Sequence, residues 1–235
     1  MDPTRYLIVN ADDLGLCAAV NAGIVAAHQQ GIVTSASLMV RQTAAPEAVE
    51  AVAALPRLAI GLHLDLGQWD YAAGQWLPAY RRCDEGDPVA VERECRDQLR
   101  LFHELVGRPP THVDSHQHVH NSEPVASTAA RIASELGVPL RGRRIRYEGG
   151  FYGQSGKGEP FPEGISSSHL IALIASLPAG WTELGCHPGT GMHGESSYSA
   201  EREVELRALC DPAVRAVLAA EGVALRSFAD APRAG

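Results

Sequence analysis

Residues 111–120 concentrate side chains that bind metals. Four of the ten histidines and one aspartate occupy the even positions of this stretch: His112, Asp114, His116, His118 and His120. Alternate residues of a β-strand point to the same side, so an extended chain would present all five side chains on one face. Imidazole and carboxylate groups are ligands for zinc and other divalent metals. Buried together, they would need partners for every polar atom, and a metal ion supplies several at once. The stretch therefore predicts a metal site.

A pair of adjacent carboxylates, Asp12 and Asp13, follows the apolar run of residues 6–10. Neighbouring side chains point in different directions, so one carboxylate could bind a metal while the other accepts a proton. Aspartate is also favoured in turns and at helix N-caps, so the pair alone decides little. His63, inside the apolar stretch 60–64, strengthens the functional interpretation. Its structural alternative is a core imidazole bonded to a backbone carbonyl.

His187 is a further candidate, because it follows a predicted strand directly. Its neighbour Cys186 could suggest a thiol nucleophile with its base. Adjacent residues of a strand face opposite ways, which disfavours that pair. His187 is therefore expected to act as an acid or base.

Two irregular segments carry aromatic side chains. The glycine-rich residues 149–158 fail the phosphate-loop pattern, so we expect a mobile loop whose Phe151 and Tyr152 can stack on a sugar. Residues 67–90 mix glycine, proline and charges and are predicted to form a long loop. Its aromatic side chains could stack on a pyranose ring or anchor the loop to the fold: Trp69, Tyr71 and Trp76.

Strand-like and helix-like segments alternate along the chain and must position these residues. Strands are predicted at residues 6–10, 34–40, 58–65, 111–120, 140–147, 181–186 and 223–228. Apolar residues at helical spacing predict helices at 16–27, 46–55, 91–106, 123–136, 166–177, 200–209 and 212–221. Strand followed by helix, repeated about seven times, predicts a parallel sheet with helical crossovers.

The length of the chain suits one α/β domain, residues 1–235, folded as a closed or nearly closed (β/α) barrel. The candidate residues each sit at or just past the C-terminal end of a predicted strand: Asp12, Asp13, His63, His116 and His187. In a barrel these strand ends form one rim, where active sites are built. An open sheet would not naturally gather them.

Composition excludes several classes of partner. A net charge of −8 argues against nucleic acid or an anionic membrane as the main partner. No apolar run reaches the length of a membrane span, and the first residues lead into a strand without a secretory signal. The five cysteines contain no CxxC pair, which is typical of free thiols in a reducing cytosol. We therefore expect a cytoplasmic protein.

Five motifs resemble those of the YdjC-like carbohydrate deacetylases, which include chitooligosaccharide deacetylases and a hopanoid-associated branch. The motifs are residues 9–15, 31–39, 61–63, 111–120 and 186–189. The resemblance spans nearly the whole chain, and the first and fourth motifs together are highly specific. Residues 67–90 and 140–165 differ from the chitooligosaccharide branch, so the substrate stays open.

This resemblance implies a distorted (β/α) barrel, one divalent metal ion and hydrolysis of an N-acetyl group on an amino sugar. It implies Asp13, His63 and His116 as metal ligands. It also implies Asp12 as the base and His187 as the acid. Three further residues match family positions and are expected to contact substrate or support the ligands: Asp114, His118 and His120.

Magnesium or zinc is expected in the site, and manganese or cobalt would also suit the mixed oxygen and nitrogen ligands. The expected substrate is a small neutral saccharide or glycoconjugate that contains N-acetylglucosamine. A homodimer is compatible with the sequence.

Two other functions stay open. A metal-dependent phosphoesterase or amidohydrolase on a similar barrel also places His-x-His on a strand. That pair usually lies on the first strand, where this chain has Asp12 and Asp13. A metal-dependent sugar-binding protein without turnover would need neither Asp12 nor His187.

Overall fold

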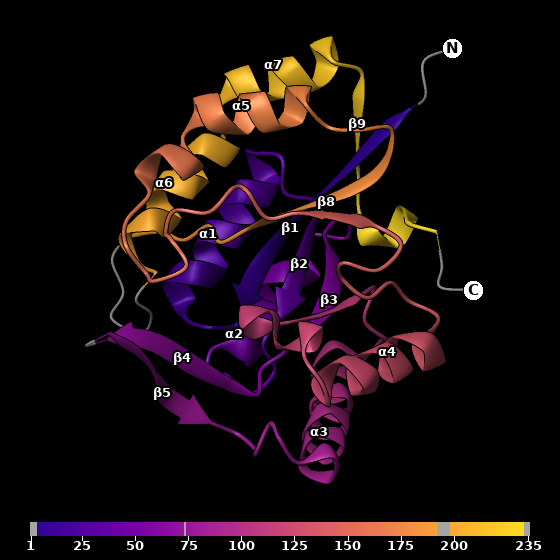
Figure 1. Cartoon of the computed structure of the whole chain (residues 1–235). Coiled ribbons are helices and arrows are strands. Elements are labelled where there is room, and N and C mark those ends of the chain that lie inside the picture. The colour runs from indigo at the N-terminus through magenta and orange to yellow at the C-terminus, as the bar shows by residue number, and fades with distance from the viewer. Residues whose placement is uncertain (1–3, 73, 192–197, 233–235) are drawn as a thin grey trace.

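A curled, mostly parallel sheet forms a half-barrel at the centre of the protein (Figure 1). The structure is a computed structural model that describes residues 4–72, 74–191 and 198–232. Within these residues the sheet has seven strands in the order β6-β3-β2-β1-β8-β7, with β9 beside β1. Their bounds are β1 Arg5–Leu14, β2 Ser35–Leu38, β3 Ala59–Leu64, β6 Val113–Ser115, β7 Arg146–Glu148, β8 Gly180–Cys186 and β9 Val223–Arg226. The predicted distorted barrel is confirmed.

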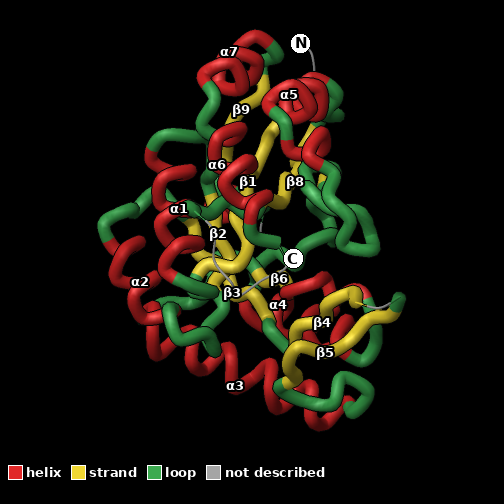
Figure 2. Tube along the Cα trace, turned by 90° about the vertical axis from the view of Figure 1, so that its left-hand side faces the viewer, coloured by secondary structure: helices red, strands yellow, loops and turns green. Residues whose placement is uncertain are grey.

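Helices lie around the curled sheet, and α5 and α7 pack together at one end of the molecule (Figures 1 and 2). The α-helices are α1 Ala18–Gln29, α2 Ala45–Ala53, α3 Pro88–Val106, α4 Val125–Leu136, α5 Ser167–Ala175, α6 Ala200–Leu209 and α7 Pro212–Ala220. Short 3₁₀ helices are η1 His116–Asn121, η2 Pro162–Ile165 and η3 Phe228–Asp230. No helix in the described ranges is long and apolar enough to cross a membrane. All five cysteines are free, as predicted.

Strand β1 is the centre of the sheet because it is apolar and buried on both faces, as is typical of parallel sheets. On one side it pairs with β8 over residues 5–11. On the other side it pairs first with β9 and then, from Asn10 onward, with β2. The pairing with β8 ends at Ala11, and Asp12 and Asp13 follow at the irregularity between the Ala11 and Leu14 pairings with β2.

Helix α3 shows how local sequence fixes the boundaries of an element. The Asp87 side chain accepts a hydrogen bond from the backbone of Val89, and Pro88 occupies the first turn. Gly107 ends the helix in a left-handed conformation (φ 73°), which costs glycine little. The helix begins three residues earlier than the predicted start at residue 91.

Three predicted elements are wrong in part. The strand at 111–120 ends at Ser115, and the chain then turns into η1 with Gln117 (φ 50°) and His118 (φ 55°) left-handed. The strand at 140–147 contributes only an isolated bridge between Leu140 and Val113, and β7 begins at Arg146. The loop at 67–90 contains an antiparallel hairpin, β4 Gly67–Ala72 and β5 Gln75–Arg81.

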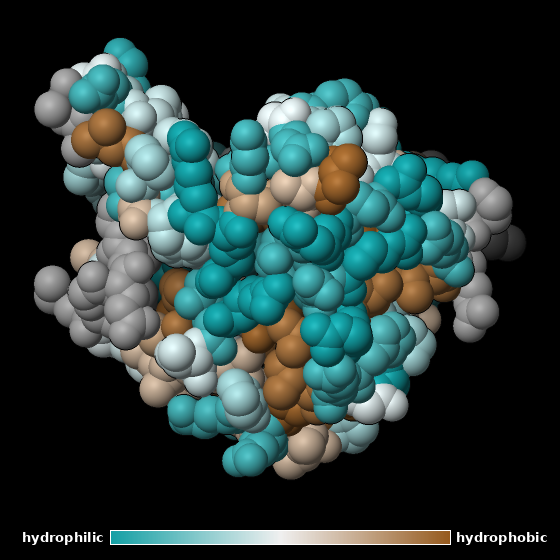
Figure 3. Space-filling view, turned by 90° about the horizontal axis from the view of Figure 1, so that it is seen from below, coloured by the Kyte–Doolittle hydropathy of each residue, from teal (hydrophilic) through white to brown (hydrophobic). Residues whose placement is uncertain are grey.

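This β4–β5 hairpin projects from the body of the molecule (Figures 1 and 2). In the view from below it forms the lobe at the upper left, set apart from the body by a notch (Figure 3). The rest of that face is largely hydrophilic, with apolar residues in separate groups.

Candidate active site

The structure brings the main candidate residues together at one cavity of about 680 Å³. Each comes from the C-terminal end of a strand or from the residues directly after it. Asp12 and Asp13 end β1, His63 lies near the end of β3, His116 follows β6, and His187 follows β8. The shared rim predicted from the sequence is therefore present.

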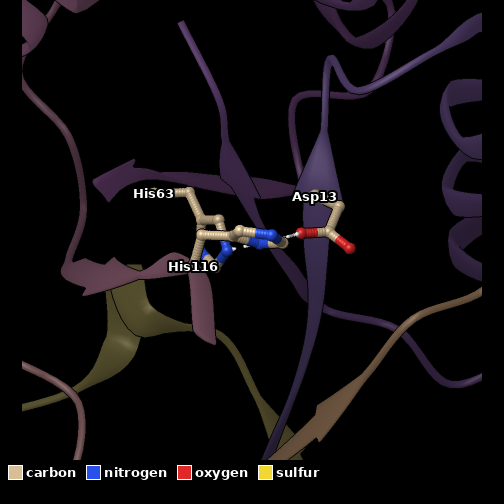
Figure 4. A group of neighbouring side chains, drawn as sticks. All are labelled: Asp13, His63 and His116. Carbon is tan, nitrogen blue, oxygen red and sulfur yellow. Dashed lines mark hydrogen bonds and ion pairs between the residues drawn. The ribbon is translucent and has the colours of Figure 1, made fainter. Parts of the chain in front are cut away.

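Asp13 faces two histidines (Figure 4). Its Oδ1 atom lies 3.0 Å from His116 Nδ1 and 3.4 Å from His63 Nε2. Asp13 has a left-handed backbone (φ 66°), which is uncommon for a residue other than glycine and is concentrated at functional sites. One potential ligand atom from each residue lies within 4.8 Å of the others.

Each imidazole is oriented by a hydrogen bond from its other nitrogen. His63 Nδ1 donates to Asp114 Oδ1 at 2.8 Å, since a buried carboxylate accepts. His116 Nε2 donates to Gln68 Oε1 at 2.6 Å, and the Gln68 amide nitrogen donates in turn to Asp70. With those other nitrogens protonated, the nitrogens that face Asp13 can each give a lone pair to a cation once they release any proton shared with Asp13. Such partners characterise histidines that bind metals, so the three residues fit a divalent cation.

Asp12, His63 and Asp114 also cluster closely enough to hold a metal, but Arg141 occupies the space between the two carboxylates. Its guanidinium donates to both oxygens of Asp12, at 2.6 and 2.7 Å, and pairs with Asp114 at 2.8 Å. The cluster therefore already holds a cation. Burial raises the pKa of Asp12, but Arg141 outweighs it and holds that pKa below its usual value.

Arg141 also donates to Glu183 at 2.7 Å. Both side chains are buried, and the second carboxylate oxygen of Glu183 has no hydrogen-bond partner among the described residues. Burial outweighs the attraction of Arg141 here and raises the pKa of Glu183 to about 7. Neither residue was anticipated from the sequence, because Arg141 is one of four arginines among residues 140–147 and nothing local distinguishes it.

Arg202 of α6 holds the far side of Asp13, with its Nη2 atom 2.6 Å from Oδ2. The side chain is buried, and its Nε donates to the carbonyl oxygen of Tyr198 at 2.9 Å. Asp13 thus keeps only Oδ1 directed at the histidines. No sequence pattern marks Arg202, which is one of several charged residues in α6.

His187 lies between the carboxylates of Asp12 and Glu205. Its Nε2 atom is 3.8 Å from Asp12 Oδ2, and its Nδ1 atom is 3.7 Å from Glu205 Oε1. Glu205 also accepts hydrogen bonds from the backbone N–H of His187 and from the Tyr198 hydroxyl. Burial lowers the pKa of His187, but Glu205 outweighs it and raises that pKa above its usual value. The protonated imidazole is therefore more stable here than in an unperturbed histidine.

The histidines of residues 111–120 do not share one face, because the strand ends at Ser115. His118 lines the cavity and contacts the ring of Tyr147 edge-on, at 5.2 Å. His120 is buried, outside the cavity lining, and bonded to the Ser115 hydroxyl. A direct contact of His120 with substrate is therefore not supported.

His112 belongs to the core. Its ring stacks on Phe228 at 3.8 Å, and its Nε2 atom lies 3.0 Å from the Ser37 hydroxyl. A Cβ at Gly61 would lie 2.3 Å from the His112 ring, so the glycine of the 61–63 motif makes room for this imidazole. The cluster that suggested a metal site thus contributes a single member, His116, to the group with Asp13 and His63.

The two aromatic residues predicted in the loop differ in exposure. Phe151 is 1% exposed, so little of its ring is available to stack on a sugar, although it lines the cavity. Tyr152 is 37% exposed and lines the same cavity. Its ring stacks on Tyr198 at 4.7 Å, and both rings contact His187 edge-on.

Comparison with known proteins identifies the family. The YdjC-like protein family matches residues 6–220, and the chain belongs to it. A carbohydrate deacetylase of Geobacillus stearothermophilus is 33% identical, over 95% of this chain and 97% of that protein. A chitooligosaccharide deacetylase of Klebsiella pneumoniae is 34% identical, over 96% and 99%. The crystal structure of an Enterococcus faecalis protein described as a candidate for cellobiose-phosphate cleavage has a TM-score of 0.79 at 25% identity, over 96% and 98%.

Proposed function

We propose that this protein is a metal-dependent hydrolase that removes the N-acetyl group from an amino sugar in a small neutral saccharide or glycoconjugate. The observation that carries the proposal is the set Asp13, His63 and His116, whose potential ligand atoms converge beside Asp12 and His187. Two relatives that match nearly the whole chain bear the names carbohydrate deacetylase and chitooligosaccharide deacetylase, which supports this substrate class.

Asp13, His63 and His116 would hold the ion, and magnesium or zinc suits this donor set. When bound, a divalent ion supplies Lewis acidity to the acetyl carbonyl and to a water molecule. Asp114 and Gln68 keep the two imidazoles in the tautomers that ligation requires.

Asp12 is proposed as the base. Its lowered pKa keeps it ionised, and both of its oxygens are oriented by Arg141. It would take a proton from the water that attacks the acetyl carbon. General bases of this kind contribute on the order of 10²–10⁴-fold to the rate.

His187 is proposed as the acid. Its raised pKa favours a proton on the ring. Glu205 orients the residue, because it accepts from the backbone N–H of His187 and lies beside the ring Nδ1 atom. As the C–N bond breaks, His187 would give its proton to the departing nitrogen, which leaves as the amine of the sugar while the acetyl group leaves as acetate. Without this proton the nitrogen would be a poor leaving group.

The phosphoesterase alternative has less support from the charges of the site. Free arginine side chains are favoured for recognition of phosphate, because their paired N–H donors match its oxygens. Arg141 and Arg202 are both engaged by carboxylates at 2.6 to 2.8 Å.

A substrate panel tests the proposal. Chelated protein is supplied with zinc, magnesium or cobalt and incubated with N-acetylglucosamine, its short β-1,4 oligomers, an N-acetylglucosaminyl lipid and sugar phosphates. We expect acetate release from at least one amino sugar and no phosphate release. Phosphate release without acetate release would indicate a phosphoesterase. Sugar binding without any turnover would indicate a binding protein.

A further inference from the structure

The β4–β5 hairpin supplies one wall of the cavity that contains Asp13, His63 and His116. It lies outside the main sheet, and two-stranded hairpins are marginally stable alone. Its base is nevertheless anchored, since Tyr80 and Arg82 both donate to the buried carboxylate of Asp65 at 2.9 and 2.8 Å. A projecting element held in this way can present a binding surface in a fixed position.

Aromatic side chains of the hairpin gather on one of its faces. Tyr71 pairs with Trp76 across the strands, and Trp69 pairs with Pro78. Residues paired in this way, and residues two apart on one strand, share a face of the hairpin. Trp76 and Trp69 both line the cavity. Trp76 is 51% exposed, so its ring is available to contact a ligand.

The two tryptophans are supported from the sides. Trp76 contacts Tyr71 edge-on at 5.4 Å. The Arg81 guanidinium lies 4.5 Å from the centre of the Trp69 ring. These contacts fix flat apolar surfaces of the kind that bind the C–H faces of a sugar ring.

Two side-chain amides tie the hairpin to the residues of the proposed metal site. Gln68 accepts from His116, as described above. Gln117, the next residue after His116, pairs with the backbone of Trp69 through both of its amide atoms, at 2.9 and 2.7 Å. Consecutive residues of the hairpin therefore bind consecutive residues of η1. The distance between the tryptophans and the site is thereby set by direct contacts.

We propose that Trp76 and Trp69 form a second sugar subsite, which holds the neutral pyranose ring adjacent to the N-acetylated one. The substrate would then be a disaccharide or a longer saccharide rather than a free monosaccharide. This inference rests on the proposed function. The cavity of about 680 Å³ exceeds the volume of one monosaccharide and falls in the range of sites that enclose larger ligands.

The test compares substrates that differ by one ring. Acetate release is measured for N-acetylglucosamine and for its β-1,4-linked dimer with the metal-loaded protein. The wild type should prefer the dimer, and Trp76→Ala should lower kcat/KM for the dimer on the order of ten-fold, the scale of a binding hot spot. Turnover of the monosaccharide should fall by a smaller factor than turnover of the dimer. Trp76→Phe should keep most of the preference because it keeps a flat ring.

Leu77→Ala is the matched control. Leu77 is 42% exposed on the same strand and does not line the cavity, so its loss should change neither substrate. An equal loss for monosaccharide and dimer in Trp76→Ala, or no preference in the wild type, would overturn the subsite.

A binding measurement separates failure of the subsite from failure of the proposed function. Calorimetric titration of metal-loaded protein with the dimer, and separately with the monosaccharide, measures the binding affinity of each sugar and needs no turnover. If no acetate forms, the deacetylase proposal fails, and dimer binding weakened by Trp76→Ala would still support the subsite. Equal dimer binding by wild type and Trp76→Ala would reject it.

Discussion

Arg202 lies 2.6 Å from Asp13 Oδ2, the carboxylate oxygen opposite the one that faces His63 and His116. One oxygen of the Asp13 carboxylate therefore faces the Arg202 guanidinium, and the other faces the proposed metal position. Burial raises the pKa of Asp13, but Arg202 and His116 outweigh it and hold that pKa well below its usual value. Asp13 is therefore ionised and oriented before an ion arrives.

Loss of Arg202 should destabilise the metal-free protein, because the buried Asp13 carboxylate loses its positive partner. A bound metal ion should compensate for part of that loss. We expect Arg202→Met to lower the free energy of unfolding by about 3–5 kcal/mol, the usual result of breaking a buried pair. Saturating zinc or magnesium should recover more stability in this variant than in the wild type. Denaturant unfolding with and without metal measures both effects.

Arg207→Met on the same helix is the control, because Arg207 pairs with Glu203 on the surface. Exposed pairs contribute about 0–1 kcal/mol. If the two variants lost equal stability, or if metal rescued neither, the assignment of Arg202 would be wrong.

Gln68 should tune metal affinity through His116. Gln68→Ala removes the acceptor of His116 Nε2 and should weaken metal binding about 10–100-fold, as expected for the hydrogen-bond partner of a ligand. Gln68→Glu keeps an acceptor and should retain most of the affinity. Calorimetric titration with zinc gives the dissociation constants. Gln75→Ala, at an exposed position of the same hairpin, should bind like the wild type, and similar affinity for all four proteins would refute the role.

Substitutions of the two adjacent aspartates should have different effects on metal binding and rate. Asp12→Asn should retain metal and lose on the order of 10²–10⁴-fold in rate, whereas Asp13→Asn should weaken metal binding itself. Elemental analysis of dialysed protein, combined with acetate release, distinguishes these outcomes. Equal loss of metal from both variants would contradict the division of roles.

Glu183 should make stability depend on pH. Its pKa rises from the ordinary value of 4.5 to about 7 on folding, so the native state binds the proton more tightly than the unfolded chain. The contribution of Glu183 to stability is therefore fully present below about pH 4.5 and is lost as pH rises through about 7. The total change is about 3 kcal/mol.

Glu183→Gln keeps a neutral side chain at all pH values. The unfolding free energy of the wild type should therefore fall relative to this variant between pH 5 and 8. Chemical denaturation at several pH values measures the difference. A constant difference across this range would show that Glu183 does not titrate as proposed.

The sequence predicted the elements whose residues are buried on both faces. The apolar runs that became β1, β3 and β8 are visible without a structure, and polar residues at their ends indicate the rim. The path after Ser115 could not be predicted in this way. Its left-handed residues Gln117 and His118 lie in a segment tied to a distant hairpin by Gln117 and Trp69.

Charged partners were also missed, because each pairs across long stretches of sequence. Arg141 binds Asp12 across 129 positions, and Arg202 binds Asp13 across 189. No local pattern marks such pairs. The sequence predicts a loop where the β4–β5 hairpin lies. The second strand of the hairpin is largely exposed, so it carries no alternation of apolar and polar residues that would indicate a strand.

The central claim is that Asp13, His63 and His116 hold the ion on which acetate release depends. The most direct test is acetate release from N-acetylglucosamine oligomers by chelated protein titrated with zinc or magnesium. Activity should rise and saturate near one equivalent of metal per chain, and His116→Ala, with its fold retained by thermal unfolding, should stay inactive throughout. Full acetate release by the chelated wild type, or metal-dependent activity of His116→Ala equal to the wild type, would contradict the account.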